Sequence, residues 1–386
     1  MRGGDITKTK EIKRYLEQLR GRYYGSRRKD KKIILDEFVK TTGHDRKYAI
    51  KLLRGWYKYK QNSINRPHRI YTEHDASVLE KVCDFLDWIN SKRIKAGLAV
   101  AVDQLIAGGE LRLSQEDRRR ILGISPATID RLLTRHGRKP KHKGHSYTKP
   151  GTLLKSQIPV RTFADWNENK VGFCEIDLVG HDGSVARGDF SWTLNFVDVK
   201  SAWCEQVAVF NKAQVHVFAG IKTVRGRLPF PLTGIDSDCG SEFINSQLYR
   251  FCIAEKITFT RARAGKKNDN AYVEQKNDSV VRRWIGYGRY DTQEQVNALN
   301  RFYELLRLYT NFFLPVMKLK AKTRVGSKVI KTYDKAATPY LRILRAKDVS
   351  NVVRSNLRDT YSRLNLVSLK REIDLVLLKL KPTKVG

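Results

Sequence analysis

Three acidic residues near the middle of the chain constrain its fold more than any other feature. Asp177 closes the apolar run that begins at Gly172, and Asp238 closes a second short run of strand-forming residues. Glu274 lies in a helical stretch, and residues 239–273 separate it from Asp238. Adjacent parallel strands in a mixed sheet end at one edge. We therefore expect both aspartates to meet there, with Glu274 approaching from the last helix.

The segment around these residues changes repeatedly between strand-like and helical patterns. Short runs rich in β-branched and aromatic residues predict strands, and apolar stripes at helical spacing predict helices. The predicted strands are Cys174–Val179, Thr193–Val199, Trp203–Phe210, Leu232–Ile235 and Ile257–Thr260. The predicted helices are Val215–Val224, Glu242–Ile253, 268–284 and 292–313. Three strands that can pair antiparallel, followed by alternating helices and strands, predict a mixed sheet with helices on both faces.

The charge of the chain indicates a polyanionic partner. The chain has 75 Lys and Arg against 40 Asp and Glu among 386 residues, which gives a formal net charge of +35. Proteins that bind phosphates carry an excess of this kind. A membrane surface or an acidic protein would fit the charge alone. However, the excess is spread along the chain rather than confined to one amphipathic helix.

The sequence also constrains where the protein works. No apolar run reaches the roughly 18 residues of a membrane helix, so we expect no membrane span. The first residues have no hydrophobic segment behind them, which argues against a secretory signal. The five cysteines have no paired spacing, which is typical of proteins from a reduced interior. We therefore expect a cytoplasmic protein with no membrane partner.

The N-terminal part predicts two basic helical domains, over residues 1–62 and 63–140. In each, a helix, a short turn and a second helix follow one another, and Ser125 with Pro126 makes a good helix start. Either unit also fits a plain helical hairpin with a solvated basic face. In a helix-turn-helix motif the second helix enters the major groove of DNA. The candidate contacts to base edges or phosphates are Arg46, Lys47, Lys51, Thr128 and Arg131.

Two further basic segments flank the predicted core, which covers residues 165–315. Residues 141–164 predict a basic linker, either a solvated hinge or an arm along a DNA groove. Residues 316–386 are again rich in Lys and Arg. A strand is predicted over Val329–Tyr333, and amphipathic helices are predicted from about Val353 and Leu366. This C-terminal segment would supply DNA contacts or subunit contacts.

The three carboxylates suit a metal site. Divalent cations such as Mg²⁺ or Mn²⁺ prefer hard anionic oxygens, and carboxylates packed together repel one another without a cation. Two ions about 3.5–4 Å apart would clamp the attacking and leaving oxygens of an in-line displacement. A single aspartate at a strand end is more often a turn residue or a helix cap. Asp236 and Asp182 also compete with Asp238 and Asp177 as ligands.

Three motifs carry a family resemblance. The stretches Glu175–Asp177, Ser237–Phe243 and Asn270–Asn277 resemble the catalytic core of retroviral integrases, and more closely that of bacterial insertion-sequence transposases of the DDE type. The resemblance covers residues 165–315. It implies a multidomain protein with a ribonuclease-H-like α/β core, N-terminal helix-turn-helix domains and a small basic C-terminal domain. The implied catalytic and metal-binding residues are Asp177, Asp238 and Glu274.

Some positions depart from the family pattern or extend it. The residue after the second aspartate is commonly Asn in the family and is Cys239 here, and the retroviral zinc-binding domain has no counterpart. Asn277 lies three residues after Glu274, so on a helix it would hold Glu274 or touch a DNA phosphate, if it is not simply solvated. Lys266 and Lys267 precede a helix N-terminus, where phosphate contact is favourable, although exposed loop lysines are common.

The resemblance implies a DNA transposase. Such a protein binds terminal inverted repeats, cleaves to expose 3′-OH ends and joins them to target DNA by metal-dependent transesterification. Its partners would be double-stranded DNA, as element ends and as target, and further copies of the chain in a dimer or tetramer. The implied setting is bacterial and nucleoid-associated. A nuclease or Holliday-junction resolvase of the same fold would cut without joining, and a repressor or domesticated transposase would bind without chemistry.

Overall fold

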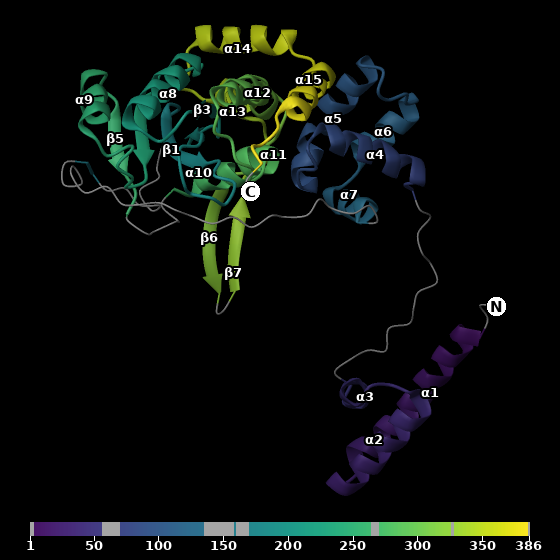
Figure 1. Ribbon diagram of the computed structural model, residues 1–386. Helices are drawn as coiled ribbons and strands as arrows, with labels where there is room; N and C mark the ends of the chain where they lie inside the picture. Colours follow the sequence, from purple (N-terminus) through teal and green to yellow (C-terminus); the bar gives the residue numbers. More distant parts are fainter. Residues whose placement is uncertain are drawn as a thin grey trace. The chain divides into compact units, whose positions relative to one another are not determined.

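The computed structural model describes residues 4–55, 70–134, 158–159, 170–263, 270–325 and 328–384. Contacts divide the chain into two compact units, Met1–Ile70 and Tyr71–Gly386 (Figure 1). Most of the predicted linker, residues 141–164, lies outside the described residues. The limits of the predicted domains remain predictions.

Helices α1 (Gly4–Gly25), α2 (Arg28–Thr42) and α3 (Arg46–Leu53) make up the described part of the first unit. Apolar side chains from all three pack into one small core. Gly43 ends α2 in the left-handed conformation, at φ 68°, and Asp45 caps α3 by accepting hydrogen bonds from two of its backbone N–H groups. The unit therefore contains the expected pair of helices with a short turn. Its DNA-binding role remains a prediction.

The second unit begins with α4 (Glu73–Phe85), α5 (Ser91–Ala107), α6 (Gln115–Gly123) and α7 (Pro126–Leu133), which we call the helical module. Ser125 caps α7 by accepting from the backbone N–H of Thr128, and Pro126 is the first residue of that helix. Asp75 of α4 is fully buried and receives a hydrogen bond of 2.9 Å from Arg120 of α6. This ion pair joins the first and third helices of the module.

A five-stranded sheet forms the centre of the second unit, in the order β3-β2-β1-β4-β5. The strands are β1 (Phe173–Gly180), β2 (Trp192–Asp198), β3 (Cys204–Val209), β4 (Gly234–Ser237) and β5 (Thr258–Arg261). The first three pair antiparallel, while β4 is parallel to β1 and β5 is parallel to β4. The mixed sheet predicted from the sequence is therefore present.

Two glycines fix how β1 and β4 align. Gly172 precedes β1 at φ 115°, and a Cβ there would collide with the Pro231 carbonyl oxygen. Gly234 is the first residue of β4, and a Cβ there would collide with the Phe173 ring. The close approach lets the Gly172 carbonyl accept from the Thr233 N–H at 2.8 Å. The parallel register starts at this point, with Phe173 opposite Gly234.

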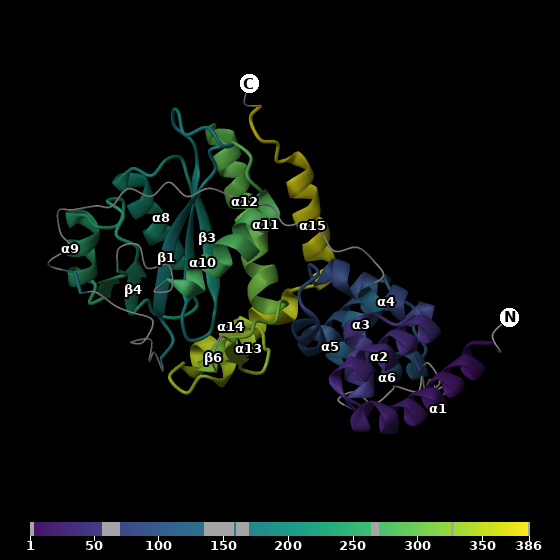
Figure 2. The same ribbon diagram turned by 90° about the horizontal axis from the view of Figure 1, so that it is seen from below.

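Helices cover both faces of the sheet, as predicted. On one face α8 (Gln214–Arg227) packs against β2 and β3, α9 (Ser246–Ala254) packs against β5, and both share an apolar core with Ile176 of β1. On the other face α10 (Ala271–Lys276) contacts β1 and β2, and α12 (Gln293–Phe312) contacts β3. Figure 2 shows α8 and α12 on either side of the strands. Because strand residues alternate between faces, Glu175 and Asp177 lie on the α10 side.

The helix predicted over 268–284 is interrupted. Its first described turn is α10, a π-helical segment η2 (Asn277–Arg282) follows, and α11 (Arg283–Ile285) ends it. A π turn has more residues than an α turn and is frequently found at functional sites. Because the π-helical segment starts at Asn277, the residues from Asn277 onward do not follow the 3.6-residue repeat assumed in the prediction.

The C-terminal segment adds a hairpin and three helices to the second unit. They are β6 (Leu319–Val325), β7 (Lys328–Tyr333), α13 (Pro339–Arg345), α14 (Asn351–Arg363) and α15 (Leu366–Lys379). Only the second strand and the last two helices were predicted from the sequence. α15 contacts α12 of the core and both α4 and α5 of the helical module. The segment thus ties the helical module to the half of the unit that contains the five-stranded sheet.

Two predictions about composition can be compared with the described residues. In those ranges no helix combines the length and the apolar character that a membrane span requires. All five cysteines are buried and carry free thiols, as their spacing predicted. The thiols therefore belong to the packed interior.

Candidate active site

Carboxylates occupy neighbouring positions on β1 and β4. The parallel register places Glu175 beside Asp236 and Ile176 beside Ser237, so Asp177 and Asp238 follow as the next pair. The structure thus brings the two aspartates of the sequence motifs together. Asp177 lies within β1 and not at its end, because β2 continues to pair with β1 as far as Gly180. Asp238 does directly follow β4.

The Asp177 carboxyl group is fixed by hydrogen bonds to both oxygens. Its Oδ1 accepts from the backbone N–H of Leu178 at 2.8 Å, and its Oδ2 accepts from the Asn277 amide at 2.7 Å. The pKa of Asp177 is raised to about 7. Burial is the main cause, the Asp238 and Glu274 carboxylates add to it, and the two hydrogen bonds act in the opposite direction. Burial and the neighbouring carboxylates together therefore disfavour full ionisation near neutral pH.

Asp238 lies in the turn after β4. Its Oδ1 accepts from the backbone N–H of Gly240 at 2.9 Å, and burial raises the pKa of the carboxyl group while this hydrogen bond lowers it. The neighbouring Cys239 is buried, and its thiol donates to the Ala262 carbonyl at 3.2 Å. The cysteine that replaces the family's usual Asn thus ties the turn to the end of β5.

Glu274 is an exposed residue of α10, and the start of that helix is anchored to the sheet. Glu175 is fully buried, and its Oε2 accepts from the backbone N–H of Val273 at 2.7 Å. Burial raises the pKa of Glu175 well above its usual value, and Asp236 and Glu274 add to the effect. These contacts hold Glu274 on the face of the sheet where the aspartates lie.

Asn270, which precedes α10, provides a second anchor. With its amide in the orientation that satisfies both ends, Asn270 donates to Asp236 Oδ2 at 3.0 Å and accepts from the backbone N–H of Asp238 at 3.3 Å. One buried side chain therefore connects the start of the helix with the end of β4. The position of Glu274 is in this way coupled to that of Asp238.

A chain of three side-chain amides leads to Asp177 from the β3 edge of the sheet. Gln206 of β3 donates to Asn195 of β2 at 2.9 Å, Asn195 donates to Asn277 at 2.9 Å, and Asn277 donates to Asp177. Register places Asn195 opposite both Gln206 and Asp177. The amide of Asn277 therefore holds Asp177, not Glu274 as proposed from the helical spacing. We call Gln206, Asn195 and Asn277 the amide chain.

The chemistry of these side chains suits a divalent cation. Among the described residues, no three His, Cys, Asp or Glu side chains converge closely enough to hold a metal ion as they stand. The donors of Asp177, Asp238 and Glu274 are nonetheless hard carboxylate oxygens, and they are close enough for two of them to raise the pKa of the third. A cation would relieve that repulsion, so the residues fit Mg²⁺ or Mn²⁺.

The candidate DNA contacts on α3 and α7 can be described within their own helices. In α3, Arg46 pairs with Asp36, while Lys47 and Lys51 are exposed. In α7, the Arg131 guanidinium donates to the Thr128 hydroxyl at 2.9 Å. The structure therefore shows local roles for Arg46, Thr128 and Arg131. Lys266 and Lys267 lie outside the described residues.

The sequence motifs contained a signal for Glu175, which was not singled out as functional, and for Asp236, which was considered only as an alternative ligand to Asp238. Glu175 precedes Asp177 by two positions, as Asp236 precedes Asp238, and in a strand this spacing places both members of a pair on one face. A larger acidic cluster was therefore predictable. Gln206 and Asn195 carried no such signal, because their alignment depends on the register of β2 with β3.

Solved structures similar to this chain include three of retroviral integrases. A chain of the simian T-cell lymphotropic virus intasome with PP2A regulatory subunit B56 gamma is 10% identical at a TM-score of 0.30, covering 55% of this chain and 69% of that chain. The HTLV-2 integrase catalytic core domain in complex with magnesium is 12% identical at a TM-score of 0.28, and the match covers 42% of this chain and 92% of that chain. The BIV integrase catalytic core domain is 15% identical at a TM-score of 0.31, and the match covers 49% of this chain and 98% of that chain. Scores this low do not establish a shared fold, so the description of the core rests on its strand order and register.

No family model matches the sequence. One relative is similar along almost its whole length: the "Uncharacterized protein y4rM" of Sinorhizobium fredii (strain NBRC 101917 / NGR234). The two are 37% identical over 342 residues, which are 87% of this chain and 95% of the relative. The match includes far more of the chain than the carboxylate cluster alone. The chain therefore belongs to the same family as protein y4rM of Sinorhizobium fredii.

Proposed function

We propose that this protein is a DNA transposase of the DDE type, with Asp177, Asp238 and Glu274 as its catalytic residues. The observation that carries the proposal is the cluster itself. Register sets Asp177 beside Asp238, and α10 brings Glu274 near enough to raise the pKa of Asp177. The whole chain carries a net charge of +35, which suits a DNA substrate.

Divalent cations held by the three carboxylates would polarise the scissile phosphodiester and stabilise the attacking and leaving oxygens. The chain's own residues orient that cluster. The amide chain fixes the Asp177 carboxyl group, and Glu175 and Asn270 hold the start of α10 and with it Glu274. Such fixed orientation lowers the reorganisation that the reaction would otherwise require.

The proposed reaction has two steps of the same kind. In the first, water bonds to phosphorus at the element end and the P–O3′ bond breaks, which leaves a 3′-OH and a 5′-phosphate. In the second, that 3′-OH bonds to a phosphorus of the target and the target's own 3′ oxygen leaves. Joining exchanges one phosphodiester for another, so the step needs no nucleotide cofactor.

We further propose that the paired helices of the N-terminal part recognise the terminal inverted repeats. Arg46, Lys47 and Lys51 of α3 and Thr128 and Arg131 of α7 are the proposed contacts, and Lys266, Lys267 and Asn277 belong to the same proposal. The hydrogen bonds of the Asn277 amide to Asp177 and Asn195 favour an orienting role for it over a phosphate contact. Because two element ends must be handled together, we expect a dimer or tetramer on DNA.

The test is a joining assay with the full-length protein. Pre-cut duplex ends that carry the inverted repeats flanking the gene are incubated with Mg²⁺ and a supercoiled plasmid, and products are separated on a gel. Joined products of end and plasmid are expected, and chelation of the metal should abolish them. If the ends and plasmid are only cut, the protein is instead a nuclease or junction resolvase of similar architecture.

A binding protein without chemistry is the remaining alternative. It would shift the element ends in a gel and yield neither cut nor joined products with Mg²⁺ or Mn²⁺. The intact carboxylate cluster argues against this alternative, because four carboxylates on one face of two strands destabilise a protein that has no use for a cation.

A further inference from the structure

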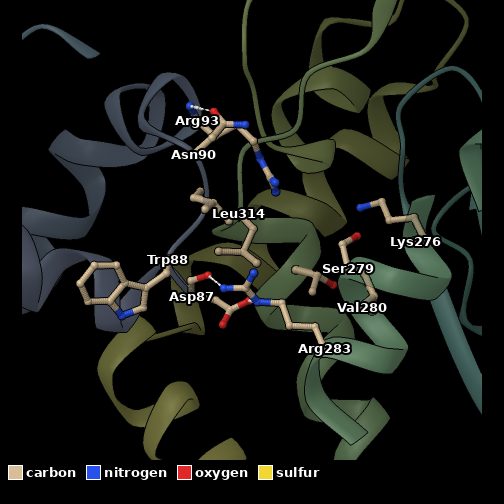
Figure 3. A pocket seen from close by; sticks show the side chains of 11 residues that line it. Asp87, Trp88, Asn90, Arg93, Lys276, Ser279, Val280, Arg283 and Leu314 are labelled. Atoms are coloured by element: carbon tan, nitrogen blue, oxygen red, sulfur yellow. Dashed lines mark hydrogen bonds and ion pairs between the residues drawn. The ribbon is translucent and has the colours of Figure 1, made fainter. Parts of the chain in front are cut away.

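A cavity of about 130 Å³ lies between the helical module and the helix that follows β5 (Figure 3). One wall is the loop after α4 with the start of α5, and it contributes Asp87 and Arg93. The opposite wall is formed by α10, η2 and α11, and it contributes Lys276 and Arg283. The end of α12 completes the lining. The volume corresponds to roughly four water molecules, which is room for a small polyatomic ion.

Lys276 is a buried lysine, with 8% of its surface exposed, and its ammonium group is hydrogen-bonded to the Cys204 thiol. Across the part of the chain that the structure describes, no carboxylate forms an ion pair with it. A buried ammonium group is costly unless an anion accompanies it.

The two arginines of the cavity are in different situations. Arg93 donates from Nε to the Pro315 carbonyl, and burial lowers its pKa to about 10. Arg283 pairs with Asp87, with Nε 2.6 Å from Oδ2. Among the described lining residues Asp87 is the one carboxylate, so a single anion faces three cations. The positive charges of Arg93, Arg283 and Lys276 also repel one another, because all three side chains line the same cavity.

Figure 3 shows the side chains of Arg93 and Lys276 extending toward the same space from two elements, while Arg283 turns to Asp87. We propose that this cavity binds a phosphate group, supplied either by inorganic phosphate or by the backbone of bound DNA. The ammonium of Lys276 and the guanidinium of Arg93 donate to its oxygens. Hydrogen bonds between charged partners in a partly dehydrated site are strong ones, and arginine matches the geometry of phosphate oxygens.

A phosphate here would join two parts of the second unit. Arg93 belongs to the helical module, and Lys276 follows Glu274 by two residues on α10. An anion bound to both would hold the module against the helix that completes the carboxylate cluster. Phosphate binding would therefore stabilise the junction between a DNA-reading module and the catalytic core.

The first experiment titrates inorganic phosphate into the full-length protein by calorimetry, in chloride buffer of matched ionic strength and without DNA or metal. Wild type and Lys276→Met are compared with Lys92→Met, which removes an exposed lysine beside Arg93 that does not line the cavity. We expect at least about tenfold weaker binding for Lys276→Met and no change for Lys92→Met. Met fills a similar volume without a buried charge, so this variant should fold and melt no lower than wild type in chloride.

A second variant guards against a local rearrangement at Lys276. Arg93→Met removes the other proposed donor from a different helix, and it should weaken phosphate binding in the same direction. Circular dichroism checks that both variants retain the wild-type helix content.

The second experiment separates the two sources of phosphate. Binding of a labelled duplex is followed by fluorescence anisotropy over a range of salt concentrations. If DNA supplies the phosphate, Lys276→Met binds the duplex more weakly, and the slope of log affinity against log salt falls by about 1. If free phosphate is the ligand, the DNA affinities of Lys276→Met and Lys92→Met agree, and only the phosphate titration differs.

The proposal would be overturned if Lys276→Met and Lys92→Met had equal affinities for phosphate and equal affinities for the duplex. The calorimetric arm needs no DNA, no metal and no catalysis. Its result is therefore independent of whether the protein proves to be a transposase.

Discussion

Two clusters of like charge lie on different sides of one short helix. Glu274 of α10 lies with the carboxylates of β1 and β4, whereas Lys276 lies with Arg93 and Arg283 at the junction with the helical module. Residues two apart on an α-helix point in nearly opposite directions, because each residue advances by about 100°. Each cluster is destabilised by its own charge. Each therefore suits an ion of the opposite sign, a divalent cation on one side and a phosphate on the other.

The two clusters differ in how they are held. Asp177 has hydrogen bonds to both carboxylate oxygens, and the amide chain connects it through η2 to β2 and β3. Lys276 has a thiol as its neighbour, and Arg93 has a single backbone carbonyl. The acidic cluster is thus oriented before any ion arrives. The cationic cluster depends more on the ion itself to complete its contacts.

The largest expected effect tests the acidic side of this comparison. Asp238→Asn replaces a charged metal ligand by a neutral amide of the same shape, and we expect joining with Mg²⁺ to fall by about 10³-fold or more. The joining assay measures it, with Glu372→Gln, an exposed carboxylate on α15, as the matched control. Normal joining by Asp238→Asn would refute the catalytic assignment.

The next effect tests whether orientation matters. Asn277→Ala removes the amide that donates to Asp177, so the pKa of Asp177 should rise further above about 7. We expect joining at neutral pH to fall about 10- to 100-fold, as is common when a group that orients a metal ligand is lost. The deficit should shrink as the pH rises above 7. The neighbouring exposed residue supplies the control, Asp278→Ala, and a pH-independent deficit in Asn277→Ala would contradict an orienting role.

Removing the one carboxylate of the cationic cluster tests how charge in the cavity controls phosphate binding. Asp87→Asn leaves three cations unopposed, so phosphate affinity should increase, by up to roughly tenfold. Asn tolerates the positive φ of 52° at this position. Calorimetry measures the change, with the exposed Glu116→Gln on α6 as control. A weaker affinity in Asp87→Asn would mean that Asp87 organises the cavity instead of opposing the ligand.

The smallest expected effect concerns stability without metal. The folded pKa of Asp177, about 7, lies above its ordinary value of 3.8, so the folded state holds this proton more tightly than the unfolded state. Stability contributed by that proton is present below about pH 4 and is lost as the pH rises to about 7. The melting temperature of Asp177→Asn, measured in a chelator, should therefore exceed that of wild type by a margin that widens over this range. Parallel melting curves would show that the repulsion is relieved by movement of the side chains.

Much of the core could be predicted because its signals are local. Runs of β-branched residues marked the strands, and the spacing of Asp177, Asp238 and Glu274 indicated the acidic cluster. Strand β6 of the C-terminal hairpin and helix α13 were missed, although Thr338 and Pro339 form a recognisable helix start.

Other features depend on contacts between distant segments, which no local pattern records. The hydrogen bonds of Asn277 to Asp177 and Asn195 require the helix after β5 to cross β1 and β2 at one particular position along the strands. The π-helical segment after α10 is set by that packing. The cationic cavity exists only because α5 docks beside α11, so nothing near Lys276 in the sequence announces it.

The close approach at Gly172 and Gly234 sets the register of β1 with β4 as far as the carboxylate cluster. A side chain at either position would wedge β1 and β4 apart or slide one past the other, and a slip by a single residue would turn Asp238 toward the opposite face of the sheet. A substitution at either glycine would therefore separate the proposed catalytic carboxylates, although every one of those residues would still be present in the sequence.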